Sequence, residues 1–247
     1  MAVTLPLVIS LPHCSSALPP EIAPTLALDP LKARVEADLG TAEIFAGLPV
    51  LATLAAPWSR LAVDLNRDPA DLGPQGVVAS LSFGGRPVFR PGQEPDPAEV
   101  ERRIASYYRP YHQRLAQALL TPGLRAFLDC HAMDPVGPAR APDAGRSRAE
   151  VVLGNRGGQT CSMEMLRRLG QALTAQGLEV AYNTPYSGGF ITRHYGPALM
   201  ARGLMAAQVE LNKGLYLDLE RQELIAPRLD QVRRRVRGAL VEFASSL

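Results

Sequence analysis

The chain has 247 residues, of which 47% are hydrophobic and 20% are charged, and its formal net charge is +2. This composition is ordinary for a soluble globular protein, and the length is sufficient for a substantial core. The small net charge gives no indication of a nucleic-acid partner, and no apolar run approaches the length of a membrane span.

The three cysteines, Cys14, Cys130 and Cys161, lack the spacing of a metal site. Their odd number argues against a disulfide framework and fits a reducing compartment. The apolar N-terminus has neither a basic region nor a small-residue cleavage site, which favours a first strand over a signal peptide. We therefore expect a cytoplasmic protein, with residues 1–247 forming a single domain.

The first part of the chain is predicted to alternate strands with a helix. A buried strand over residues 3–10 precedes an amphipathic helix over 29–47. Two more strands are predicted over 49–55 and 60–65, and residues 68–97 form a long stretch rich in Pro, Gly and Asp. A loop of this length is usually functional or mobile.

The second part continues the alternation with an amphipathic helix over 96–120, which Pro110 should kink. A strand over residues 125–132 and a polar loop over 137–150 follow it. A helix is then predicted over 162–177, strands over 178–185 and 206–213, and a closing helix over 228–246. The alternation predicts an α/β fold with a mixed, mostly parallel sheet and helices on both faces.

Four short segments place polar side chains where an apolar strand ends. The residues concerned are His13, the group Asp64, Asn66 and Arg67, the pair Asp129 and His131, and Glu210. In an open α/β sheet such segments converge at one edge, which is where ligands bind.

Two histidines on different strands, together with a carboxylate, form a frequent catalytic zinc shell. His13 and His131 are the natural pair, and Glu210 is placed to act as a general base for water. Asp129 shares a strand face with His131, but we expect it to support the site without easily reaching the imidazole ring. The alternatives are a loop histidine at 13, a buried histidine held by an aspartate at 131, and a salt bridge at Glu210.

Asn66 and Arg67 together could clamp a carboxylate, although a salt bridge from Arg67 to Asp64 or Asp68 is the simpler interpretation. The segment "YSGGFITRHYG" (186–196) joins two glycines to a polar cluster. Glycines there either allow the backbone to approach a ligand closely or form a tight turn.

Eight segments make the sequence similar to a known family. In chain order they are "LVISLPHCSSALPPE", "WSRLAVDLNRDP", "VFRPGQEPD", "YYRPYHQRL", "FLDCHA", "LGNRGGQTC", "YSGGFITRHYG" and "AAQVELNKGLY". They resemble the N-formylglutamate amidohydrolase (deformylase) family from about residue 5 to residue 218. The resemblance implies a zinc-carboxypeptidase-like (phosphorylase/hydrolase-like) fold. It also implies hydrolysis of an N-formyl amino acid, which in histidine degradation is N-formyl-L-glutamate.

The resemblance implies that His13, in the "PH" pair, and His131, in "DCHA", bind Zn²⁺ or another divalent metal. It implies that Glu210, in "QVE", is the general base. The expected partner is therefore a small-molecule N-acyl amino acid, and the sequence leaves the oligomeric state open.

The third metal ligand is less evident, because the carboxypeptidase pattern H-x-x-E would need a glutamate where this chain has Ser16. The family commonly has "D-x-D-W" in the next helix, and "EADL" (36–39) falls at that place. We expect Asp38 to be the third ligand, with Glu36 as the alternative.

The "DLNR" segment, which also occurs in aspartoacylase relatives, implies that Asn66 and Arg67 contact substrate and that Arg60 contacts the oxyanion or a carboxylate. Arg193 is a further candidate carboxylate ligand, and Gly189 a candidate for close contact with substrate. Departures from the family pattern leave two alternatives open, namely hydrolysis of another N-acyl amino acid or small amide acid, and non-catalytic binding of acidic amino acids.

Overall fold

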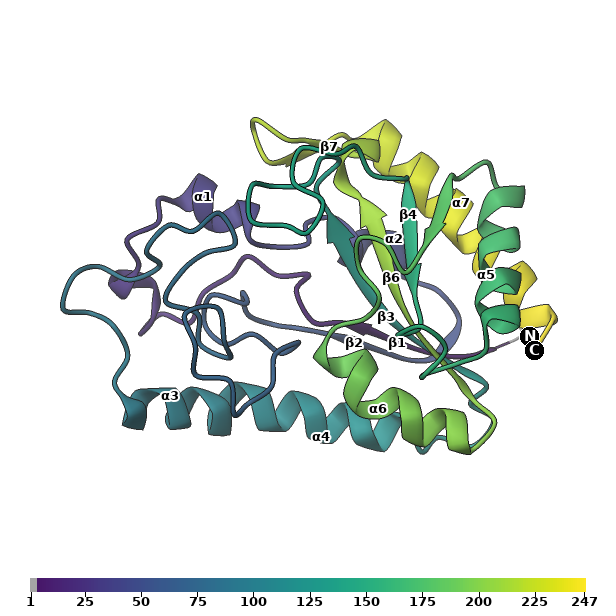
Figure 1. Ribbon diagram of the computed structural model, residues 1–247, viewed down its shortest axis with the longest axis horizontal. Helices are drawn as coiled ribbons and strands as arrows, with labels where there is room; N and C mark the ends of the chain where they lie inside the picture. The colour runs from purple at the N-terminus through teal and green to yellow at the C-terminus, as the bar shows by residue number, and fades with distance from the viewer. Residues whose placement is uncertain (1–3) are drawn as a thin grey trace.

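The computed structural model describes residues 4–247, so Val3, the first residue of the predicted initial strand, lies outside the described residues. A six-stranded sheet runs through its centre in the order β2-β1-β3-β6-β4-β5 (Figure 1). The strands are β1 (Leu5–Leu11), β2 (Val50–Ala55), β3 (Ala126–Met133), β4 (Val151–Gly154), β5 (Val180–Tyr182) and β6 (Met205–Asn212). Only the β4–β6 pair is antiparallel in this sheet, so the predicted mixed, mostly parallel sheet is confirmed.

Helices cover both faces of the sheet, also as predicted (Figure 1). On one face lie α2 (Thr41–Phe45), α5 (Met163–Ala175) and α7 (Ala226–Ser245). On the other lie α4 (Arg109–Ala118) and α6 (Phe190–Ala201). Two apolar clusters separate these helices from the sheet, because strand side chains alternate between its faces.

The same alternation determines to which face of the sheet the polar residues of β3 point. In β3, Leu128 and Cys130 join the cluster under α5 and α7, whereas Phe127 joins the cluster under α4 and α6. Asp129 and His131 therefore point away from the first cluster, and Cys130 points away from them, as the sequence predicts.

The predicted helix over 29–47 is wrong as a single element. It consists of α1 (Pro30–Val35), which Asp29 caps by accepting from the Lys32 amide, and α2, separated by a break over 36–40. Gly40 begins α2 with φ of 88°, a left-handed conformation that interrupts a right-handed helix and favours glycine. The break therefore lets Asp38 leave the helical path.

The predicted strand over 60–65 is also wrong. Its backbone forms turns, and the Asp64 amide donates to the carbonyl of Val77 within an irregular segment. Leu61 is buried in a small cluster with residues such as Leu26 and Phe89, and Val63 joins the cluster under α4 and α6, so their alternation reflects packing and not strand pairing.

The long helix predicted over 96–120 forms as α3 (Pro97–Arg103), a π-helical turn over Ile104–Tyr108, and α4. Pro110 has no amide hydrogen to donate one turn back, and the ladder is widened immediately before it. The disturbance predicted at this proline therefore takes the form of a π turn.

The sequence analysis missed α6, β4 and the short hairpin of β7 (Leu217–Asp218) and β8 (Glu223–Leu224). Helix α6 follows two glycines and contains Pro197, both of which argue locally against a helix. In the part of the chain that is described, no helix has the length and apolar character needed to cross a membrane.

His112 joins α4 to the segment that carries Asp64. Its Nε2 donates to the carbonyl of Leu65 at 2.9 Å, and its Nδ1 accepts from the Tyr195 hydroxyl at 3.0 Å. Burial lowers the pKa of His112 to about 4, so the ring is neutral in the folded protein at neutral pH.

We expect His112 to make folding sensitive to mild acid. Between pH 6.5 and 4 the unfolded chain binds a proton at this position that the folded chain does not, so the free energy of unfolding falls as the pH falls. The loss attributable to His112 is roughly 2–3 kcal/mol. Urea unfolding across this pH range should show a smaller dependence in His112→Gln. The exposed His194 provides the control, and an equal change in His194→Gln would contradict the assignment.

Candidate metal centre and catalytic cavity

A cavity of about 530 Å³ lies at the carboxyl ends of β1, β3 and β6. His13, His131 and Glu210 line it, together with parts of the loops over 82–86 and 185–189. The predicted polar segments therefore meet at one sheet edge, although the chain separates them by up to two hundred residues.

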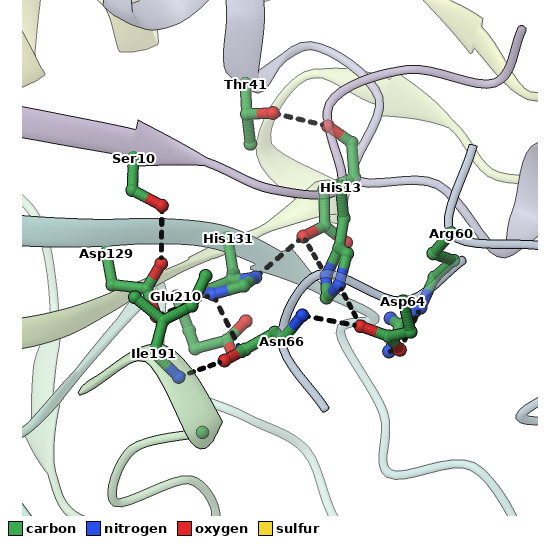
Figure 2. A network of polar contacts seen from close by, with 12 residues as sticks. Ser10, His13, Thr41, Arg60, Asp64, Asn66, Asp129, His131, Ile191 and Glu210 are labelled. Carbon is green, nitrogen blue, oxygen red and sulfur yellow. Dashed lines mark hydrogen bonds and ion pairs between the residues drawn. The ribbon is translucent and has the colours of Figure 1, made fainter. Parts of the chain in front are cut away.

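His13, Asp38 and His131 are buried together in this cavity. Figure 2 shows the two histidines side by side. One nitrogen of each ring and one oxygen of the carboxylate all lie within 4.8 Å of one another. Asp38 Oδ2 is 3.1 Å from His131 Nδ1 and 3.5 Å from His13 Nδ1. The Asp38 amide donates to the carbonyl of His13 at 2.9 Å, which fixes the helix break against the end of β1.

The other nitrogen of each histidine faces a second carboxylate. His13 Nε2 is 2.7 Å from Asp64 Oδ1, and His131 Nε2 is 3.2 Å from Asp129 Oδ2 (Figure 2). The expectation that Asp129 does not easily reach the imidazole ring of His131 is wrong. The two residues lie two positions apart on the same face of β3, and the Asp129 carboxylate is within contact distance of the ring. Carboxylates in these positions orient histidines that use the opposite nitrogen as a metal ligand.

The hydrogen bonding and charge of the atoms of the trio His13, Asp38 and His131 fit a divalent metal. Within residues 4–247, His13 Nδ1 is buried without a hydrogen-bond partner, which is costly unless something else binds it. Burial would raise the pKa of Asp38, but His13 and His131 together hold that pKa well below its usual range, so the carboxylate is ionised. Two imidazoles and one carboxylate suit Zn²⁺.

Glu36, the alternative third ligand, is not part of the trio. Its Oε2 accepts from the backbone amide of Phe83 at 3.0 Å, which ties the loop over 82–86 to the end of α1. Asp38 is therefore the carboxylate that the fold brings to the two histidines.

Asp64 organises the "DLNR" segment, a role that the sequence analysis did not foresee. It accepts from Arg60 Nη2 at 2.6 Å and Nε at 3.1 Å, and from the Asn66 amide at 2.9 Å, in addition to its contact with His13. Burial would raise the pKa of Asp64, but Arg60 and His13 lower it well below its usual value. Arg60 lines the cavity, and its positive charge is paired with the Asp64 carboxylate.

Asn66 has a defined orientation. Its Oδ1 accepts from the Ile191 amide at 2.7 Å, so its Nδ2 is the end that lies 3.2 Å from His131 Nε2 and faces the cavity. A Cβ on Gly189 would lie 2.3 Å from that Nδ2, so the close approach requires glycine. Both residues line the cavity, and their contact with substrate stays a prediction.

The two predicted carboxylate-binding arginines differ in position. Arg67 lines the cavity, with Nε 3.7 Å from Asp64 Oδ2, a long version of the ion pair considered from sequence. Arg193 is not among the lining residues, and its exposed guanidinium lies 3.3 Å from Asp68. The helix that begins at Phe190 turns Arg193 toward solvent, so the structure does not bring it to the cavity with the other predicted site residues.

Glu210 lies in β6 with His131 as its register partner in β3. Its carboxylate is bound by the Gln208 amide at 2.7 Å rather than by an arginine, which removes the salt-bridge interpretation for the described residues. Burial raises the pKa of Glu210 to about 7, although His131 acts in the opposite direction. A carboxylate with such a pKa can exchange protons near neutral pH.

Comparisons with known proteins place this chain in a family. The family model for N-formylglutamate amidohydrolase matches residues 5–217. The N-formylglutamate deformylase of Pseudomonas aeruginosa is 31% identical over 231 residues, which cover 87% of this chain and 83% of the relative. The enzyme of the same name from Pseudomonas putida is 29% identical, with coverages of 87% and 82%.

A solved structure has the same fold. The N-formylglutamate amidohydrolase from Ralstonia eutropha superposes with a TM-score of 0.83 at 24% identity, covering 99% of this chain and 95% of that chain.

Proposed function

This chain belongs to the N-formylglutamate amidohydrolase family, and from that premise we propose that it hydrolyses N-formyl-L-glutamate to formate and L-glutamate. The observation that carries the proposal is one cavity in which the buried trio His13, Asp38 and His131 lies beside Glu210. Such a reaction belongs to histidine degradation, as the sequence resemblance implies, and a single domain over 1–247 would perform it.

The trio would hold Zn²⁺, with Asp64 and Asp129 keeping the outer nitrogens of the two histidines engaged. A zinc ion there would activate water and polarise the formyl carbonyl group. With a metal bound at the ring nitrogens next to Asp38, Asp64 and Asp129 would accept the hydrogens of the outer ring nitrogens and so orient the two histidines.

Glu210 accepts a proton from the attacking water and delivers it to the nitrogen of the leaving amine. The carbon–oxygen bond forms, the carbon–nitrogen bond breaks, and formate and the free amino acid result. The Asn66 amide and the Arg60 guanidinium supply hydrogen-bond donors for the oxygen that becomes negatively charged.

The substrate also carries two carboxylates. Arg67 and Arg86 line the cavity, and within residues 4–247 neither guanidinium makes a hydrogen bond. Arg60 and Arg148, by contrast, are each bound to an aspartate. We assign Arg67 and Arg86 to the substrate carboxylates, because an arginine whose N–H groups are not already hydrogen-bonded can bind a carboxylate bidentately; the only charged partner of Arg67 in residues 4–247 is Asp64, at 3.7 Å.

A larger N-acyl amino acid is the second candidate, because the cavity is large enough to admit one. If each of the ~12 non-hydrogen atoms of N-formylglutamate took a water molecule's share of about 30 Å³, the substrate would occupy about 360 Å³. The cavity of about 530 Å³ leaves additional space.

The proposal predicts rapid release of formate from N-formyl-L-glutamate by the purified protein supplied with Zn²⁺. N-formyl-L-aspartate and N-acetyl-L-glutamate, assayed alongside, should react more slowly. Preference for the acetyl compound would favour the larger-substrate alternative, and zinc-loaded protein that hydrolyses none of the three would refute the proposal.

A further inference from the structure

Gln208 lies in β6, two residues before Glu210, so both side chains are on the same face of the sheet. It is buried, with 4% of its surface exposed, and it lines the cavity. The sequence analysis assigned it no role, and no step described above uses it directly.

The orientation of the Gln208 amide follows from its partners. The backbone amide of Gly189 can only donate, and it lies 2.5 Å from one end of the side chain, which must therefore be the oxygen, Oε1. The nitrogen, Nε2, is thereby turned toward Glu210 and donates to its Oε1 at 2.7 Å. A flipped amide would lose both hydrogen bonds, so Gln208 has one stable orientation.

This contact restricts the carboxylate of Glu210. One of its two oxygens is engaged by Gln208, which leaves Oε2 for the reacting centre. The engaged amide also replaces part of the hydration that burial removes from the ionised carboxylate. A carboxylate that is held in one rotamer spends no time in orientations from which it cannot accept the proton, so the rate of proton transfer is not reduced by them.

We propose that Gln208 is a positioning residue that fixes the general base, taking its own orientation from the Gly189 amide at the start of α6. The inference rests on the proposed function, since it assumes that Glu210 transfers the proton. It concerns the direction of the carboxylate and not the binding of substrate or metal.

The test is Gln208→Met, which keeps the length of the side chain and removes both hydrogen bonds. We expect kcat to fall by about 10- to 100-fold, with KM changed by less than about twofold and zinc content unchanged. Gln208→Glu keeps an acceptor for Gly189 but turns a carboxylate toward Glu210, so it should not restore kcat.

Gln222 provides a matched control, because it is equally buried, at 4%, and does not line the cavity. Gln222→Met should lower the melting temperature without lowering kcat. A near-wild-type kcat in Gln208→Met, or a fall in kcat that matches an equal loss of zinc, would overturn the inference.

A spectroscopic measurement separates this inference from the proposed function. The side-chain carboxyl carbon resonance of Glu210, assigned by its absence in Glu210→Gln, should shift in Gln208→Met and not in Gln222→Met. Wild-type protein that releases no formate would refute the proposed function, whereas an unshifted resonance would refute the role of Gln208 whatever the activity.

Discussion

Replacing Glu210 with glutamine is expected to lower kcat by about 100- to 10,000-fold while zinc remains bound. The amide keeps the size and polarity of the side chain but cannot accept the proton of the attacking water. Because Glu210 is not part of the trio of His13, Asp38 and His131, the metal content should not change. Steady-state formate release and metal analysis of the same preparation measure the two effects together.

Glu164→Gln is the control for Glu210→Gln, because Glu164 pairs with Arg168 on the surface of α5, away from the cavity. It should retain wild-type kcat. Glu210→Asp should also be slow, because the shorter side chain withdraws the carboxylate from the reacting centre. A rate near that of the wild type in Glu210→Gln would show that another group transfers the proton.

Removing the metal is expected to abolish formate release and to destabilise the fold. At a free zinc concentration about 1,000 times the Kd, binding adds about 4 kcal/mol to the free energy of unfolding. For a chain of this length, that corresponds to a rise of roughly 10 °C in Tm. Calorimetry of chelated and zinc-loaded protein measures this shift independently of activity.

Two variants identify the carboxylate that holds the metal. Asp38→Asn should lose most of the zinc-dependent rise in Tm, because the amide is a poor zinc ligand, whereas Glu36→Gln should retain it. The reverse result would make Glu36 the ligand and would require the break between α1 and α2 to rearrange. No rise in Tm for the wild type with any divalent metal would refute the metal centre.

The sequence predicts the strand ends that carry the site because polar residues there interrupt apolar runs. His13, His131 and Glu210 are visible in this way, and the structure brings them together. The role of Asp64 is not visible, because its segment is irregular and its partners come from the loop that follows β1 and from its own turn. Its contacts depend on tertiary structure rather than on local pattern.

The same limit applies to the direction in which a segment points its side chains. Arg193 was assigned to the substrate from its neighbours in sequence, but the helix that begins at Phe190 turns it toward solvent. The single helix predicted over 29–47 follows its apolar spacing correctly, yet Gly40 in its left-handed conformation divides it. Both cases concern backbone direction, which hydrophobic periodicity alone does not determine.

The start of α6 is capped by residues of the cavity. Asn66 accepts from the amide of Ile191 and Gln208 accepts from that of Gly189, while the N-cap residue itself contributes no side chain. Mutations that change catalysis and mutations that change the stability of α6 therefore depend on one another in this protein. A substitution at Asn66 that altered specificity, or one at Gln208 that altered the rate, would also uncap the helix. A serine or aspartate cap at 189 could repair the helix only after Asn66 had been replaced, because its Cβ would occupy the space of Asn66 Nδ2. The order in which such mutations can accumulate is therefore constrained by the fold.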